Sequence, residues 1–191
     1  YLTYYYYQIN VGKMIPIVPK LFQSFNPLFI VALTFPINGL FSWLRNKGKE
    51  PSTPKKIGIG MFIAAFAYTI MIFASANLTS PSEIAQSSIT DYERVTPYWL
   101  ISTYLMLTIA ELFLSPMGLS FVSKVAPQRF QGLMQGGWLL TTAVGNKLLF
   151  LGTYFWERIE LWQLWLIFVG VCVASGLLIF ALMKKLEAAT S

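Results

Sequence analysis

The stretch YLMLTIAELFLSPMG, Tyr104 to Gly118, is an apolar run with one carboxylate, Glu111, at its centre. No other acidic side chain occurs between Tyr98 and Val122. A helix of this length can cross a bilayer, where an unpaired charge near the midplane costs at least ~2.5 kcal/mol. The position of Glu111 therefore predicts a functional role for it within the membrane.

Four polar residues of this stretch are spaced by four, three and four positions, so they share one face of a helix: Tyr104, Thr108, Glu111 and Ser115. Lipid cannot satisfy such a face, which predicts that it lines a protein interior or a water-filled cavity. A structural hydrogen bond to a neighbouring helix is the alternative. Pro116 predicts a bend just beyond the carboxylate, where freed carbonyls can face a ligand.

Composition places the whole chain in a membrane. The 191 residues are 55% hydrophobic and 16% aromatic, and only 12% are charged. There is no histidine and only one cysteine, which excludes a histidine-ligated metal and a disulfide framework. We expect no cofactor and no bound metal, and the net charge of +6 is not taken as a nucleic-acid footprint.

Five apolar segments are each long enough to span about 30 Å of hydrocarbon. They are predicted near residues 21–44, 57–78, 98–122, 133–155 and 162–183. Residues 1–20 are expected to hold the end of a preceding span and an external loop, 21–183 the five-helix bundle, and 184–191 a tail. Because the chain begins at Tyr1 without a recognisable targeting signal, we expect a piece of a longer protein.

Lysine and arginine are unevenly distributed between the two sets of connections. Nine lie in the loops after the first and third spans and after the fifth span, and four lie on the opposite side. The positive-inside rule therefore predicts that the C-terminus is cytoplasmic in a multi-pass plasma-membrane protein. We interpret the basic loop 45–56 as a turn whose charges set orientation.

Two further spans also carry a polar face. Gln135, Trp138, Thr142 and Asn146 form one in the fourth span, and Gln23, Asn26, Thr34 and Asn38 form one in the first. The second and fifth spans carry no charged residues and few polar ones. They are predicted to be peripheral, lipid-facing helices with small residues at helix contacts. The three polar faces are expected to converge on a binding cavity.

Glycines at the ends of two spans suggest movement or close packing. Gly132 and Gly136 form a G-x-x-x-G pattern in the fourth span, and Gly118 lies near the matching end of the third. Separation of these ends and a static helix contact are both compatible with the pattern. The cavity has no nucleophile-base pair, metal cluster or phosphate loop, so we do not expect an enzyme.

Three motifs resemble the proton-dependent oligopeptide transporters, a branch of the major facilitator superfamily. ELFLSPMGLS (111–120) with KVAP (124–127) is similar to their tenth helix. FQSFNPL (22–28) resembles the start of the eighth, and GLMQGGW (132–138) with Gly145 and Asn146 resembles the eleventh. The fold implied is all-α, a partial C-terminal six-helix bundle comprising about helices 8–12.

The resemblance implies inward symport of di- and tripeptides with protons. Glu111 would receive the peptide amino terminus and is the candidate for proton coupling, with Asn26 and Ser115 nearby and Trp138 shaping a side-chain pocket. Gln23 and Asn146 complete the candidate substrate-binding set. The candidate hinge or gate residues are Pro116, Gly118, Gly132 and Gly136.

Two departures accompany the resemblance. The family's N-terminal bundle, the partner that this half would need, is absent from these residues. Lys147 places a cation within a span where a neutral residue is expected, and it either snorkels outward or approaches the cavity.

Other functions remain open. One is a facilitator-type carrier of another small solute such as nitrate, an amino acid or a drug. Another is a non-transporting membrane scaffold subunit whose polar faces bind other helices.

Overall fold

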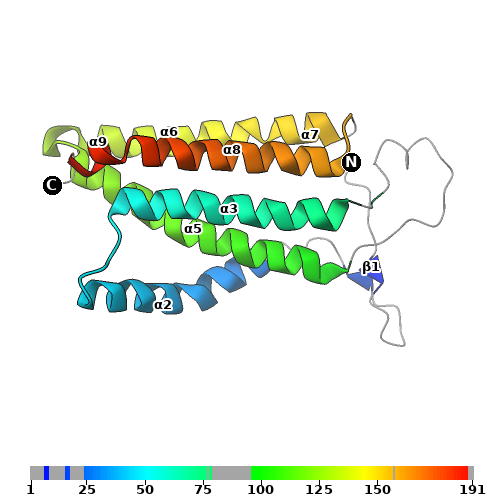
Figure 1. The fold of residues 1–191 in the computed structure, drawn as a ribbon. Helices are drawn as coiled ribbons and strands as arrows, with labels where there is room; N and C mark the ends of the chain where they lie inside the picture. The colour runs from blue at the N-terminus through cyan, green and yellow to red at the C-terminus, as the bar shows by residue number, and fades with distance from the viewer. Residues whose placement is uncertain are drawn as a thin grey trace.

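The structure, a computed structural model, describes residues 7–8, 16–17, 24–76, 78, 96–156 and 158–188. Its elements are β1 Tyr7–Gln8, β2 Pro16–Ile17, α2 Phe25–Asn46, α3 Thr53–Ser75, α5 Pro97–Val125, the 3₁₀ turn η1 Gln128–Phe130, α6 Gln131–Leu148, α7 Phe150–Trp156, α8 Leu161–Ala181 and α9 Met183–Ala188. The long helices lie side by side in a bundle (Figure 1). The described part is therefore helical apart from one short strand pair.

Local sequence explains where the helices start and stop. α3 and α5 each have a proline in the first turn, where the missing N–H costs nothing. α2 ends where Gly48 adopts φ 64°, a conformation that glycine tolerates without a Cβ clash. The N–H of Gly48 then donates to the carbonyl of Arg45, and that of Lys49 donates to Leu44, both at 2.9 Å.

α3 is the best-packed helix of the bundle, because its interfaces with α5 and with α8 are the two largest between any described elements. A Cβ on Gly60 would lie 3.0 Å from both Phe113 and Leu114 of α5, so a larger residue would require these neighbours to shift. Ala64, Ala65 and Ala67 are also buried. Small residues thus lie at the helix contacts, as predicted for this span, while Phe62, Phe66 and Phe73 of α3 remain exposed. α3 packs between two helices and still presents an apolar face outward.

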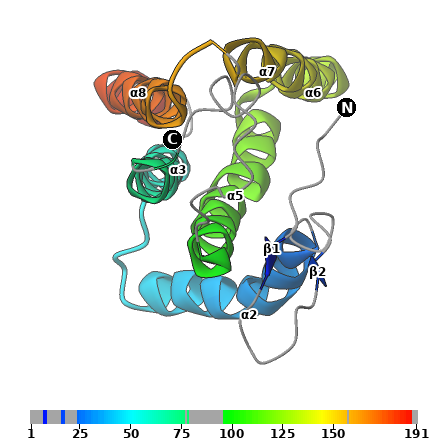
Figure 2. The same ribbon diagram turned by 90° about the vertical axis from the view of Figure 1, so that its right-hand side faces the viewer.

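The remaining helices lie around α5. Figure 2 shows α5 between α2 on one side and α6 with α7 on the other, and both α2 and α6 contact α5. The predicted fourth span, 133–155, is not one helix. It is divided into α6 and α7 at Leu149, whose N–H donates to the carbonyl of Asn146 at 3.3 Å.

Among the described residues, four helices are long and apolar enough to cross a membrane: α2, α3, α5 and α8. The prediction of five such spans is corrected to this extent, since polar and glycine residues make α6 less apolar and Leu149 interrupts it. The fifth predicted span ends at Ala181, and part of the predicted tail forms the short helix α9.

The stretch 1–20 is described only at the strand pair. β1 and β2 are antiparallel, with Tyr7 opposite Ile17 and Gln8 opposite Pro16. These four residues are extended, whereas the end of a span and an external loop are predicted for the stretch. The rest of it lies outside the described residues.

Candidate functional site

The polar face of α5 meets the polar face of α2 at Asn26. The Asn26 amide nitrogen donates to Glu111 Oε2 at 3.4 Å, and the Thr108 hydroxyl donates to Asn26 Oδ1 at 2.8 Å. The two ends of one amide are thus held by two α5 side chains spaced three residues apart. This contact joins residues 85 positions apart in the chain, and it aligns the predicted Glu111 and Asn26 at one point of the bundle.

Burial differs sharply within this group. Thr108 is 0% exposed, Asn26 is half-buried, and the Glu111 side chain is exposed on the α5 surface. The hydroxyl of Thr108 also lies 2.8 Å from the carbonyl of Tyr104, so its single proton is shared between two acceptors. Glu111 is therefore an exposed hydrogen-bond acceptor whose partner, Asn26, is itself held by the buried Thr108.

Ser115 lies one helical turn beyond Glu111 on the same face and is exposed. Pro116 follows within α5, which continues to Val125. Because proline lacks an N–H, the carbonyl of Leu112 has no helical donor at this position. A polar atom of the backbone is thus available within one turn of the carboxylate.

α6 reaches α5 near the other end of that helix. Gln135 Nε2 donates to Ser123 Oγ at 2.9 Å, and Gln131 Nε2 donates to the Ser123 carbonyl at 3.2 Å. A Cβ built on Gly118 would lie 2.1 Å from Trp138 Cζ2, so the indole rests directly against the glycine backbone. Sequence reasoning did not single out Ser123, the residue to which both glutamines are anchored.

The predicted site residues therefore fall into two groups on α5. Asn26 joins Thr108 and Glu111, while Trp138 joins Gly118, about 10 Å further along the helix axis at 1.5 Å per residue. Asn146 is exposed on α6, and no described residue bonds its side chain. Gln23 lies outside the described residues.

The remaining residues of the predicted polar faces and of the predicted hinge or gate positions have other surroundings. Asn38 is exposed, and the Thr34 hydroxyl donates to the carbonyl of Ile30 in its own helix. A Cβ on Gly132 or Gly136 would meet no atom within 4 Å, so neither glycine makes a tight helix contact here. Lys147 is exposed and has no ion-pair partner in the described part of the chain.

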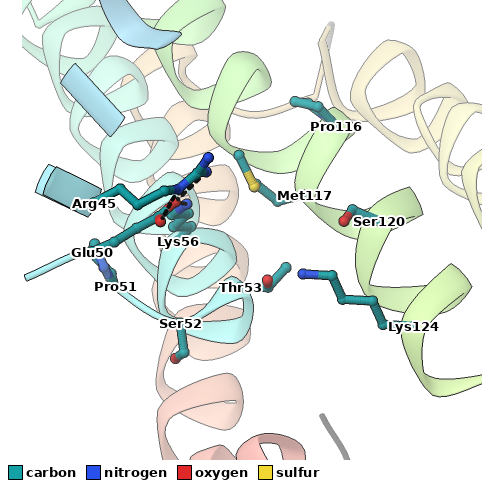
Figure 3. A pocket seen from close by; sticks show the side chains of 10 residues that line it. All are labelled: Arg45, Glu50, Pro51, Ser52, Thr53, Lys56, Pro116, Met117, Ser120 and Lys124. Atoms are coloured by element: carbon teal, nitrogen blue, oxygen red, sulfur yellow. Dashed lines mark hydrogen bonds and ion pairs between the residues drawn. The ribbon is translucent and has the colours of Figure 1, made fainter. Parts of the chain in front are cut away.

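A pocket of about 680 Å³ opens between the α2–α3 connection and the end of α5. Figure 3 shows its lining, in which Arg45, Glu50 and Lys56 are joined on one wall and Lys124 extends from α5 toward Thr53. Arg45 Nε lies 2.7 Å from Glu50 Oε2, and Lys56 Nζ bonds the other oxygen. These two donors lower the pKa of Glu50 from 4.5 to about 2.

Lys56 is unusual because it is only 4% exposed. Its ammonium lies 4.2 Å from the centre of the Phe41 ring, and Phe41 itself packs edge-on against Phe113 of α5 at 5.0 Å. A buried cation of this kind requires its carboxylate partner. The orientation role assigned to the charges of 45–56 therefore missed an ordered ion network, whose signal in the sequence was one acidic residue among the five cations.

The α2–α3 connection also contacts the C-terminal helix. Glu187 of α9 accepts a hydrogen bond from the Ser52 hydroxyl and lies 3.0 Å from Lys55 Nζ. The hydrogen bond from Ser52, followed by the hydrogen bond from Lys55, lowers the pKa of Glu187. In the described residues no group of three or more histidine, cysteine or acidic side chains could hold a metal ion.

The chain is similar to known transporters over most of its length. A family model described as PTR2, POT family, matches residues 3–158. An uncharacterized transporter, YclF, of Bacillus subtilis (strain 168) is 38% identical over 129 residues, covering 66% of this chain and 23% of the relative. The peptide transporter YePEPT of Yersinia enterocolitica is 35% identical over 129 residues, covering 65% and 23%.

Solved structures agree in fold. The crystal structure of a peptide transporter POT in complex with sulfate superposes with a TM-score of 0.78 at 23% identity, covering 94% of this chain and 33% of that one. That of a POT family transporter in complex with 5-aminolevulinic acid gives 0.75 at 27% identity, covering 94% and 34%. The chain thus spans about a quarter of the aligned curated relatives and a third of these structures.

Proposed function

This chain belongs to the POT family, and we propose that it is part of a carrier that moves di- and tripeptides with protons across the plasma membrane by alternating access. Within that carrier we place it in the C-terminal six-helix bundle, as about helices 8–12. The missing partner is then the N-terminal bundle of the same protein, and two such bundles move around a site between them.

The observation that carries the proposal is the exposed Glu111 carboxylate held against Asn26 on a membrane-spanning helix. A carboxylate in this position binds a cationic group, and a peptide supplies one as its amino terminus. Asn26 lies beside the carboxylate and offers an amide to the same ligand. Glu111 is also the one acidic side chain of α5, so it is the candidate proton acceptor.

The other predicted residues take roles around this contact. Ser115 extends the polar face by one turn, and the carbonyl freed by Pro116 lies within the same turn. Trp138 shapes a side-chain pocket further along α5, with Gln23 and Asn146 completing the substrate-binding set. Pro116, Gly118, Gly132 and Gly136 are the proposed hinge or gate positions, where helix ends separate as access alternates.

The distribution of lysine and arginine predicts which end of the bundle faces the cytoplasm. Nine of the 14 basic residues lie at the end of α2, in the α2–α3 connection, at the start of α3, at the end of α5, in η1 and in α9, and we place this end of the bundle in the cytoplasm. Named relatives support the substrate class, since dipeptide and tripeptide permease B of Aliivibrio fischeri is 30% identical over 125 residues.

Replacing Glu111 by Gln in the full-length carrier tests the proposal. We expect peptide-driven proton uptake into proteoliposomes to fall to background, because glutamine neither binds an ammonium as a charge partner nor takes up a proton. Glu160→Gln, at the start of α8, is the matched control and should transport normally. Near-normal uptake by Glu111→Gln would contradict the proposed role.

A second candidate cargo is a small amine-bearing solute that is not a peptide. One structural neighbour binds 5-aminolevulinic acid, which shows that a POT family transporter accommodates such a compound. Competition of labelled di-alanine uptake by unlabelled di-alanine, a free amino acid and nitrate separates the candidates. Competition by the dipeptide alone supports peptide transport.

A further inference from the structure

The pocket at the proposed cytoplasmic end shares only Pro116 with the residues proposed for peptide transport. Its ten lining residues come from the end of α2, the α2–α3 connection, the start of α3 and the last part of α5: Arg45, Glu50, Pro51, Ser52, Thr53, Lys56, Pro116, Met117, Ser120 and Lys124. Three are cations and one is a carboxylate, which leaves an excess of two positive charges. Nothing in the peptide-transport proposal uses this excess.

Glu50 does not occupy all the hydrogen-bond donors that line the pocket. Arg45 uses Nε and one terminal nitrogen on the carboxylate, and Lys56 uses one contact, so both retain further N–H groups. Glu50 in turn is bonded through both oxygens, which reduces its repulsion of a second anion. The ion network is therefore an ordered wall that still presents positive charge.

Lys124 supplies the opposite wall. It is exposed, extends toward Thr53 in Figure 3, and has no acidic partner within 4 Å in the described part of the chain. Thr53 and Ser120, which both carry hydroxyls, also line the pocket, with Ser120 on the same helix as Lys124. Cations on two walls, together with hydroxyl-bearing residues, match the three or more acceptor oxygens of a phosphate group.

The position of the pocket near the membrane surface indicates phospholipid headgroups as one source of the phosphate group. α2 ends at Asn46, α3 begins at Thr53 and α5 ends at Val125, so in the proposed membrane placement the charged residues of the pocket lie where these helices leave the hydrocarbon. Headgroup phosphates of anionic phospholipids lie at this level, and the potential of the cytoplasmic leaflet attracts basic groups there.

We propose that this pocket binds a phosphate group, with Arg45, Lys56 and Lys124 as its cationic ligands. The ligand is either the headgroup of an anionic phospholipid or a free phosphate. Lys124 is the residue to vary, because its removal leaves the buried Glu50–Lys56 contact intact.

The test uses the full-length carrier purified in detergent, with thermal unfolding as the readout. Dioctanoyl phosphatidylglycerol is titrated against dioctanoyl phosphatidylcholine, and inorganic phosphate against chloride at equal ionic strength. The variants are Lys124→Gln and Lys124→Arg. Lys49→Gln is the matched control, since Lys49 is an exposed cation of the same connection that does not line the pocket.

We expect phosphatidylglycerol, and not phosphatidylcholine, to raise the Tm of the wild type and of Lys49→Gln by a few degrees. Lys124→Gln should weaken the apparent affinity by about tenfold, the loss of one charge-assisted hydrogen bond, and Lys124→Arg should restore it. A response to inorganic phosphate with the same dependence on Lys124 identifies a free phosphate as the ligand. No response to either probe, or an equal response of Lys124→Gln and wild type, overturns the proposal.

Discussion

The Thr108 hydroxyl lies 2.8 Å from Asn26 Oδ1, across the interface between α5 and α2. An amide whose oxygen is held in this way must present its nitrogen on the opposite side, where Glu111 Oε2 lies at 3.4 Å. The buried threonine therefore orients the donor that accompanies the candidate substrate carboxylate. Thr108 acts through Asn26 and is a positioning residue.

Thr108→Val removes this hydroxyl while keeping the shape of the side chain. In the full-length carrier we expect KM for a dipeptide to rise about five- to tenfold with little change in the maximal rate, because roughly 1 kcal/mol of orientation is lost. Thr108→Ser, which keeps the hydroxyl, should restore KM. Uptake kinetics in proteoliposomes measure both quantities.

Thr103→Val is the matched control for that experiment. Thr103 is also buried, but its hydroxyl donates only to the carbonyl of Trp99 in its own helix. We expect KM to stay at the wild-type value in this variant. An equal rise of KM in the two valine variants would assign the effect to helix stability and contradict the orienting role of Thr108.

Gly118→Ala should disturb the contact between α5 and α6. The new methyl would lie 2.1 Å from Trp138 Cζ2, so the indole must move, at a cost of roughly 1–3 kcal/mol. We expect a lower Tm for the purified carrier. Gly136→Ala meets no atom within 4 Å and should leave Tm unchanged or slightly higher.

A second variant separates packing from function at the same contact. Gly118→Ala combined with Trp138→Leu removes the clash and should recover Tm. If Trp138 shapes the substrate pocket, uptake should remain impaired in the double variant. Full recovery of uptake would show that Trp138 serves only to pack against Gly118.

Glu50→Gln should destabilise the end of the bundle near the pocket. It leaves the Lys56 ammonium, which is 4% exposed, without its counter-charge, and losing one partner of such a pair costs about 3 kcal/mol. Thermal unfolding of the purified protein measures the loss. Adding Lys56→Met removes the unpaired charge and should restore much of the stability; a double variant no more stable than Glu50→Gln would contradict this account.

The stabilisation by Glu50 should depend on pH in a defined range. Because the folded protein lowers the pKa of Glu50 from 4.5 to about 2, the folded state favours the ionised carboxylate. Its contribution is complete above about pH 5 and is lost as pH falls from 4.5 toward 2. The Tm difference between wild type and Glu50→Gln should be constant from pH 5 to 8 and shrink below pH 4.5; a difference that persists undiminished at pH 3 contradicts the assignment.

Much of this molecule follows from the sequence by itself. Apolar segments of about 20 residues identify a membrane protein, and helical spacing places Thr108, Glu111 and Ser115 on one face of α5. Both follow from local physics, since burial in lipid depends on composition and the face of a side chain depends on a period of 3.6 residues. The motif resemblance added the family, to which the chain does belong.

Only the tertiary structure decided which helix faces meet and at which position along the helix axes they do so. Periodicity assigns a side chain to a face but fixes neither the rotation of a helix nor its axial register against a neighbour. Asn26 therefore reaches Thr108 and Glu111, whereas Trp138 reaches Gly118, although both residues belong to predicted polar faces. The same limit applies to α3: its sequence predicts small residues at helix contacts, but only the structure shows that the partners are α5 and α8.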